Sequence, residues 1–165
     1  QAYHHFENLE GITEQIAQSL KPHGVLLLKD YIGPNQLQRS AKQLTVCQPL
    51  WDALPDRLRT NAAGHVSQQL HIPAPESLPP YEAVRAEDIL PILESQLHCV
   101  HKHCYGGVLF PLCNGFAHNY EENAEDLARL EIFWQLDQHF SENGLVDPNF
   151  IRAIYARKDS PYSVT

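Results

Sequence analysis

Four consecutive apolar residues, Val25-Leu26-Leu27-Leu28, constrain the fold of this 165-residue chain more than any other stretch. A strand with one face in solvent alternates apolar and polar residues, and this run does not alternate. It therefore predicts a strand over residues 25–29 that is covered on both faces, as in a parallel sheet flanked by helices. We expect this strand to be the most buried one and to lie centrally in its sheet.

A helix is predicted immediately before that strand. Its apolar residues recur at helical intervals: Leu9, Ile12, Ile16 and Leu20. Asn8 is suited to cap its start, and the run Lys21-Pro22-His23-Gly24 is a strong signal for its end.

The rest of the chain predicts further helices and strands in alternation. Helices are expected over residues 35–54, with a break near Pro49, and over residues 86–96 and 124–142. The residues expected to face inward from the last helix are Leu127, Leu130, Ile132, Phe133, Leu136 and Phe140. Strands are expected over residues 98–105 and 150–156, and residues 60–80 form a long loop of the kind that serves as a lid or insertion. This order indicates an α/β fold with helices packed on a sheet.

Composition narrows the possible partners and location. The net charge of −8 argues against nucleic acid, whose binding depends on clusters of Lys and Arg. No apolar run approaches the roughly 20 residues of a membrane helix, so no membrane is expected. The four cysteines (Cys47, Cys99, Cys104 and Cys113) come without a secretory signal and are interpreted as reduced thiols of a cytoplasmic protein.

Several stretches resemble the class I S-adenosylmethionine-dependent methyltransferases. The stretch AYHHFENLEGITEQIAQSLKPHGVLLLKDYIGP is similar to the part of that family in which strand four ends in a His-His loop and Leu-Lys-Pro-x-Gly leads into strand five. The stretches DYIGPNQLQRSAKQL, LPDRLR and PYEAVRAEDILPIL resemble one subgroup of it. The resemblance runs from Tyr3 to Lys158.

This resemblance implies a Rossmann-like methyltransferase sheet of which the chain holds the C-terminal half only: the end of strand four, and strands five, six and seven with their flanking helices. Residues 98–105 would be strand six. Residues 150–157 would be strand seven, antiparallel between strands five and six.

The family binds S-adenosylmethionine through a glycine-rich turn after strand one and an acidic residue at the end of strand two, following the logic of dinucleotide sites. This chain contains no Gly-x-Gly. We therefore expect residues 1–165 to be the C-terminal part of a single methyltransferase-like domain, with most cofactor contacts upstream of Gln1. The expected partner is that upstream half or a second copy of the chain, and the chain alone is expected not to bind the cofactor tightly.

The implied function is methyl transfer from S-adenosylmethionine to a small-molecule or carrier-bound acceptor; the alternative is a non-catalytic, truncated methyltransferase-like interaction module. His4 and His5 are the candidate catalytic residues, because histidine exchanges protons near neutral pH, and His4 is also a candidate cofactor contact. Alternatively, one histidine packs and the other caps the following helix. Asp30 and Tyr31 are candidate acceptor-binding residues, the alternative being a turn in which the aspartate satisfies backbone donors.

Two other groups of polar residues have structural interpretations. Glu82 and Arg85 stand one helical turn apart and are expected to pair. The cluster HCVHKHC, residues 98–104, suggests zinc, but strand alternation places Cys104 on the opposite face from Cys99, and a surface strand is favoured over a metal-binding protein. A metal site that uses His4 or His5 with other residues has no support in the sequence, and no metal is predicted.

Overall fold

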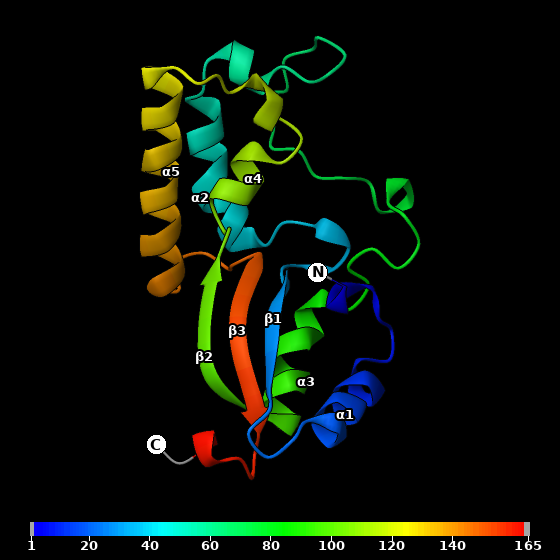
Figure 1. Ribbon diagram of the computed structural model, residues 1–165. Helices are drawn as coiled ribbons and strands as arrows, with labels where there is room; N and C mark the ends of the chain where they lie inside the picture. Colours follow the sequence, from blue (N-terminus) through cyan, green and yellow to red (C-terminus); the bar gives the residue numbers. More distant parts are fainter. Residues whose placement is uncertain (1, 164–165) are drawn as a thin grey trace. The chain divides into compact units, whose positions relative to one another are not determined.

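The computed structural model describes residues 2–163 of the chain (Figure 1). Their contacts divide the chain into two compact units. Unit 1 consists of residues 1–38, 74–104 and 150–165, and unit 2 of residues 39–73 and 105–149. Each unit is described separately below.

Unit 1 begins with a 3₁₀ turn, Tyr3–His5, and the helix α1, Leu9–Ser19. The Asn8 side chain caps this helix by accepting a hydrogen bond from the Gly11 N–H, as its residue type predicts. The predicted end is also confirmed, since the Gly24 N–H donates to the Lys21 carbonyl in the turn that precedes the first strand.

The sheet of unit 1 has three strands in the order β1-β3-β2. They are β1, Val25–Tyr31, β2, Leu97–Tyr105, and β3, Phe150–Arg157. β3 pairs antiparallel with β1, with Leu28 opposite Ala153 (Figure 1). The placement of the last strand between the other two, antiparallel to β1, is therefore confirmed. The expected parallel, Rossmann-like sheet around residues 25–29 is wrong, since the described residues form a three-stranded antiparallel sheet.

The prediction that residues 25–28 form the central and most buried strand is also wrong. β1 lies at one edge of the described sheet. Leu28 is 8% exposed, whereas Val25 and Leu27 are 41% and 72% exposed. An apolar run shows that both faces of a strand favour burial. Whether they are buried depends on which other elements pack against the strand.

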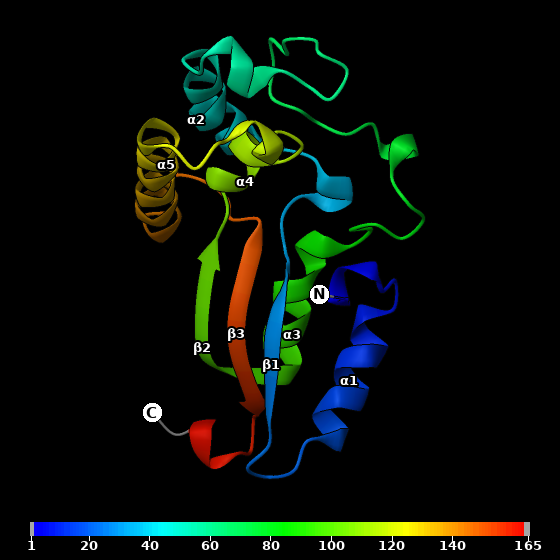
Figure 2. The same ribbon diagram turned by 45° about the horizontal axis from the view of Figure 1, so that its top comes forward.

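Two helices lie against the sheet on one side, α1 and α3, Ile89–Gln96 (Figure 2). The helix predicted over residues 86–96 is thus confirmed, with a 3₁₀ turn at its start. Pro91 is accommodated because it falls in the first turn of α3, where a backbone N–H has no partner within the helix.

Unit 2 contains α2, Ala41–Asp52, α4, Leu109–Cys113, and α5, Ala124–Glu142. The helix predicted over residues 35–54 starts later, at a capping box formed by Ser40 and Gln43, and it continues through Pro49 instead of breaking there. The core of the unit comprises Cys47, Trp51, Leu54, Leu58, Leu70, Val108, Leu112, Phe116, Phe133 and Val146.

The bounds predicted for α5 are confirmed at both ends, but two of its inward positions are wrong. Leu127 and Ile132 are 53% and 57% exposed. The buried residues of α5 are instead Asp126, Phe133 and Asp137. The apolar pattern was misleading because two positions of the buried face carry aspartate.

Asp137 is buried because its carboxylate binds backbone N–H groups. It accepts hydrogen bonds from Gly106 at 2.7 Å, from Val108 at 2.6 Å and from Leu109 at 3.1 Å. These three donors lie just before α4 or at its first residue. One carboxylate therefore fixes the backbone at the start of this short helix.

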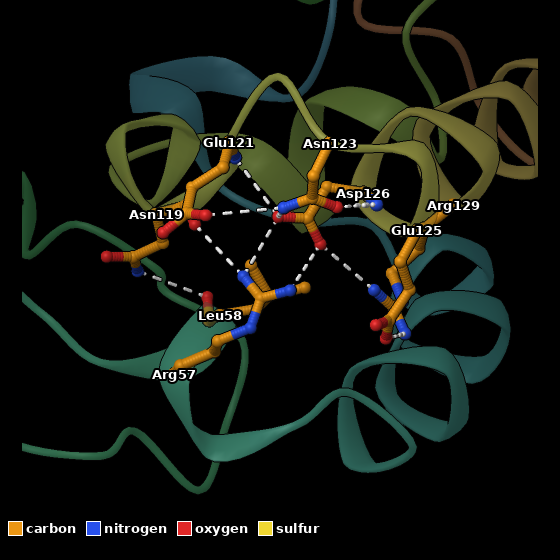
Figure 3. A network of polar contacts seen from close by, with 8 residues as sticks. All are labelled: Arg57, Leu58, Asn119, Glu121, Asn123, Glu125, Asp126 and Arg129. Carbon is orange, nitrogen blue, oxygen red and sulfur yellow. Dashed lines mark hydrogen bonds and ion pairs between the residues drawn. The ribbon is translucent and has the colours of Figure 1, made fainter.

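Asp126 is the centre of a second polar network (Figure 3). Its fully buried carboxylate accepts two hydrogen bonds from the Arg57 guanidinium, at 2.9 and 2.5 Å, and one from Arg129 at 3.1 Å. It also accepts from the Glu121 N–H. Asn119 extends the network by donating to the Leu58 carbonyl, so the 3₁₀ turn Asp56–Arg59 is tied to the start of α5.

Between Arg59 and Ala86 the described regular structure is limited to an isolated bridge, Thr60 with Val66, and a 3₁₀ turn, Pro75–Ser77. The role of this segment as a lid stays a prediction. No helix in the described part of the chain combines the length and apolar character needed to cross a membrane.

Replacing Asp126 by Asn should flatten the acid dependence of the free energy of unfolding. The hydrogen bonds from Arg57 lower the pKa of Asp126 to about 2, whereas an aspartate in an unfolded chain titrates near pH ~3.9. Because the folded-state pKa is the lower one, this stabilisation is complete above about pH 4 and is lost as the pH falls toward about 2.

The measurement is urea unfolding of the wild type and Asp126→Asn across that pH range. The matched control is Glu125→Gln, which changes an exposed carboxylate in the same helical turn. An equal loss of stability on acidification in the wild type and Asp126→Asn would contradict this assignment.

Candidate functional site

The candidate site lies in unit 1, where the N-terminal 3₁₀ turn meets the end of β1. Asp30, the penultimate residue of β1, is 2% exposed. Its Oδ2 accepts hydrogen bonds from the backbone N–H groups of Ala2 at 3.0 Å and Tyr3 at 2.9 Å. Its Oδ1 accepts from the Tyr31 N–H at 2.9 Å. The interpretation of Asp30 as a residue that satisfies backbone donors is confirmed, but its placement in a turn is wrong, because it lies in β1.

The same carboxylate orients His4. The Nδ1 atom of His4, whose ring is buried, forms a hydrogen bond with Asp30 Oδ1. Burial alone would raise the pKa of Asp30, but the hydrogen bonds from His4, Tyr3 and Ala2 outweigh it and hold the pKa below its usual value. An ionised carboxylate only accepts hydrogen bonds, so Nδ1 of His4 carries the proton and Nε2 of the neutral ring keeps a free lone pair.

The Nε2 atom of His4 faces Glu82, which sequence reasoning did not place in the site. The Nε2 atom of His4 lies 3.4 Å from Glu82 Oε1, and Nδ1 of His5 lies 3.8 Å from Glu82 Oε2. The ring centroids of His4 and His5 are 4.0 Å apart. The expected pairing of Glu82 with Arg85 is wrong, because Arg85 binds other carboxylates.

Arg85 forms ion pairs with Glu10 of α1 and with Asp88, each at 2.8 Å. The hydrogen bonds from Arg85 lower the pKa of Glu10 to about 2. These contacts fix the chain three residues beyond Glu82 and leave the Glu82 carboxylate to the two histidines.

The backbone around Glu82 is strained. Tyr81 and Ala83, on either side of it, have φ angles of 67° and 50°, in the left-handed region that favours glycine. Gln36 and Leu37 share this conformation, and the Gln36 N–H donates to the Ala83 carbonyl at 2.8 Å. Such conformations cost on the order of 1–3 kcal/mol each and are concentrated at functional sites.

Tyr31, the other predicted acceptor-binding residue, is buried beside the histidines. Its hydroxyl donates to the Pro34 carbonyl at 2.9 Å, and its ring meets those of His4 and Phe150 edge to face. All four predicted site residues thus lie in one cluster. The roles predicted for them in catalysis and acceptor binding stay predictions.

The four cysteines are free, as expected for reduced thiols. Burial raises the pKa of every one of these thiols, to about 12 for Cys47 and about 11 for Cys113. A raised pKa keeps a thiol protonated and weakly nucleophilic, so the structure does not favour cysteine chemistry.

Comparison of the chain with protein-family models, with curated protein sequences and with solved structures gave no match. The methyltransferase resemblance therefore stays a prediction. What the site offers chemically is a histidine with a directed lone pair, a second histidine and a half-buried carboxylate. These groups can accept a proton, bind a polar ligand or bind a cation.

Replacing Asp30 by Ala should change the tautomer of His4. In the wild type the neutral ring is expected to carry its proton on Nδ1, because Asp30 accepts there. Without the carboxylate, the ring should shift toward the Nε2–H form. The measurement is two-dimensional NMR of ¹⁵N-labelled histidine side chains, with the exposed His101 as an internal control. An Nε2–H tautomer in the wild type would contradict the assigned orientation.

Proposed function

We propose that this chain supplies the acceptor side of an S-adenosylmethionine-dependent methyltransferase that acts on a small-molecule or carrier-bound acceptor. The observation that supports it best is the position of β3, antiparallel between β1 and β2, with His4 and His5 at the end of β1. This is the arrangement that the resemblance implies for strands five, seven and six.

In this proposal each residue of the cluster has a separate role toward the acceptor. Nε2 of His4 takes the proton that the acceptor loses, and Asp30 is a positioning residue that holds the ring. His5 and Glu82 lie beside Nε2 and bind polar groups of the acceptor. Tyr31 packs against His4 and limits its rotation.

The cofactor would supply the methyl group as an electrophile on its sulfonium. The described residues do not by themselves fit this cofactor, because they include neither a glycine-rich turn nor an acidic residue at the end of a second strand. Those contacts belong to an upstream half, and His4 is the only residue of this chain that we assign to the cofactor.

An upstream half would also cover the open side of the sheet. β1 has no neighbouring strand on its outer edge among the described residues, and Leu27 projects from it into solvent. A hollow of about 510 Å³ lies on this sheet, lined by Leu27, Leu28, Lys29, His101, His103, Arg152, Ala153 and Ile154. An unpaired edge next to exposed apolar residues favours association with another chain or domain.

The decisive experiment compares the full-length natural protein with residues 1–165 alone. The full-length protein should bind S-adenosylmethionine in calorimetry, whereas residues 1–165 should show no micromolar binding. In the full-length protein, His4→Gln should slow methyl transfer by about 10²-fold or more, the usual contribution of a proton-transfer residue.

The control variant is His118→Gln, at an exposed position of unit 2, which should transfer methyl groups at the wild-type rate. Micromolar cofactor binding by residues 1–165 alone would overturn the proposed division of the fold. A full-length protein that neither binds nor uses the cofactor would favour the non-catalytic interaction module.

Residues 1–165, prepared alone, should associate through the open face of β1. Light scattering should give a mass above the 18.8 kDa of one chain. Leu27→Lys should reduce this mass, because a charge at a 72% exposed position opposes burial without disturbing the core. The control is Leu127→Lys, an equally drastic change at an exposed position of unit 2. A stable monomer of the wild-type chain would contradict this prediction.

A further inference from the structure

We propose that His4, His5 and Glu82 form a binding site for a divalent transition-metal ion of the zinc type. Among the described residues they are the one group of three or more His, Cys, Asp or Glu side chains that offers ligand atoms within 4.8 Å of one another. The site goes beyond the proposed function, because its existence does not depend on methyl transfer.

The distance between His4 and Glu82 fits an ion better than it fits a hydrogen bond, and the distance between His5 and Glu82 is slightly wider. Two ligand atoms held at about 2.0–2.2 Å by a tetrahedral zinc ion lie about 3.4 Å apart. The Nε2 atom of His4 and Oε1 of Glu82 are 3.4 Å apart, and Nδ1 of His5 and Oε2 of Glu82 are 3.8 Å apart. Both separations exceed the roughly 2.7–3.2 Å of a good N–H···O hydrogen bond. Nδ1 of His5 also donates a hydrogen bond to the Tyr81 carbonyl at 3.2 Å, and that proton leaves when an ion binds there.

The kinds of ligand also fit. Two histidines and one glutamate are a known ligand set of zinc sites that keep a fourth position open for water or substrate. Two histidines and one carboxylate also suit other divalent first-row metals. The carboxylate held against the far nitrogen of His4 completes the arrangement, because metal-binding histidines commonly donate their second N–H to such a group.

The charge of the cluster favours a cation. Asp30 and Glu82 bring two carboxylates close to the two imidazoles, and no Lys or Arg of the described residues pairs with either carboxylate. The nearest guanidinium in sequence, that of Arg85, is bound to Glu10 and Asp88. A divalent ion would balance the two carboxylates.

The site has separate supports for its ligands, so it is largely formed in advance. Asp30 and the 3₁₀ turn hold His4, and His5 follows it in the chain. The strained turn at Tyr81 and Ala83 holds Glu82. His5 and Glu82 remain partly exposed, which gives an ion a path to the site.

A bound ion would occupy Nε2 of His4, so this nitrogen would not take a proton at the same time. An acceptor hydroxyl bound at the open position of the ion would become more acidic and release its proton to water. That step rests on the proposed function, whereas the metal site itself does not.

The test is metal binding by the 165-residue chain after treatment with a chelator, with no cofactor or acceptor present. Titration with zinc chloride against a chromophoric competing chelator should show one tightly bound equivalent. Glu82→Gln and His5→Gln should each weaken binding by about tenfold or more, since each removes a ligand. His101→Gln is the matched control and should bind zinc like the wild type.

Cobalt(II) in place of zinc reports the ligands directly. The expected spectrum has d–d bands of a four-coordinate site without the charge-transfer band of a cobalt–thiolate bond. No binding in the micromolar range, unchanged binding in both ligand variants, or a thiolate band would overturn the proposal. His5→Gln keeps the test valid if Glu82→Gln misfolds, because the His5 side chain is 44% exposed. A chain that binds zinc in this way but never supports methyl transfer would refute the proposed function alone.

Discussion

The arrangement of unit 1 around the histidines depends on one buried carboxylate, that of Asp30. An ionised group removed from water is costly unless it is paired or hydrogen-bonded. Here four donors surround it: three backbone N–H groups and Nδ1 of His4. Because two of those N–H groups belong to Ala2 and Tyr3, the carboxylate fixes a segment 27–28 residues away in the sequence at the end of β1. The direction of the His4 ring follows from this contact.

Unit 2 uses the same physical device in its own core. The Asp137 carboxylate accepts hydrogen bonds from three backbone N–H groups at the start of α4. The Asp126 carboxylate accepts hydrogen bonds from two arginine side chains and from one backbone N–H. In both units, segments without regular structure are held by a buried carboxylate instead of by apolar packing alone. Such contacts are geometrically demanding, since each donor must point at an oxygen.

The sequence predicted the features that depend on neighbouring residues. The cap at Asn8 and the ends of α5 followed from local residue types, and they agree with the structure. It did not predict features that depend on distant residues. The exposure of Leu27 depends on which elements cover the sheet. The buried face of α5 is set by partners far along the chain, the Arg57 side chain for Asp126 and the Gly106 N–H for Asp137. Asp30 and Tyr31 were selected because they follow a predicted strand, and His4 and His5 were selected from the methyltransferase resemblance. Glu82 was missed because it lies in a segment without periodicity.

Two opposing effects determine the position of Glu82: backbone strain in the residues beside it and the ion pairs of Arg85, which hold the chain nearby. The ion pairs of Arg85 are solvent-accessible and contribute only modestly to stability. Two left-handed residues beside Glu82 cost on the order of 1–3 kcal/mol each. The exposed ion pairs on this side of the site therefore do not offset the strain by themselves, unlike the firmly held His4 side. A ligand that bridges Glu82 to the histidines would shift this balance toward the ordered turn, so binding and the conformation of residues 81–83 should be coupled.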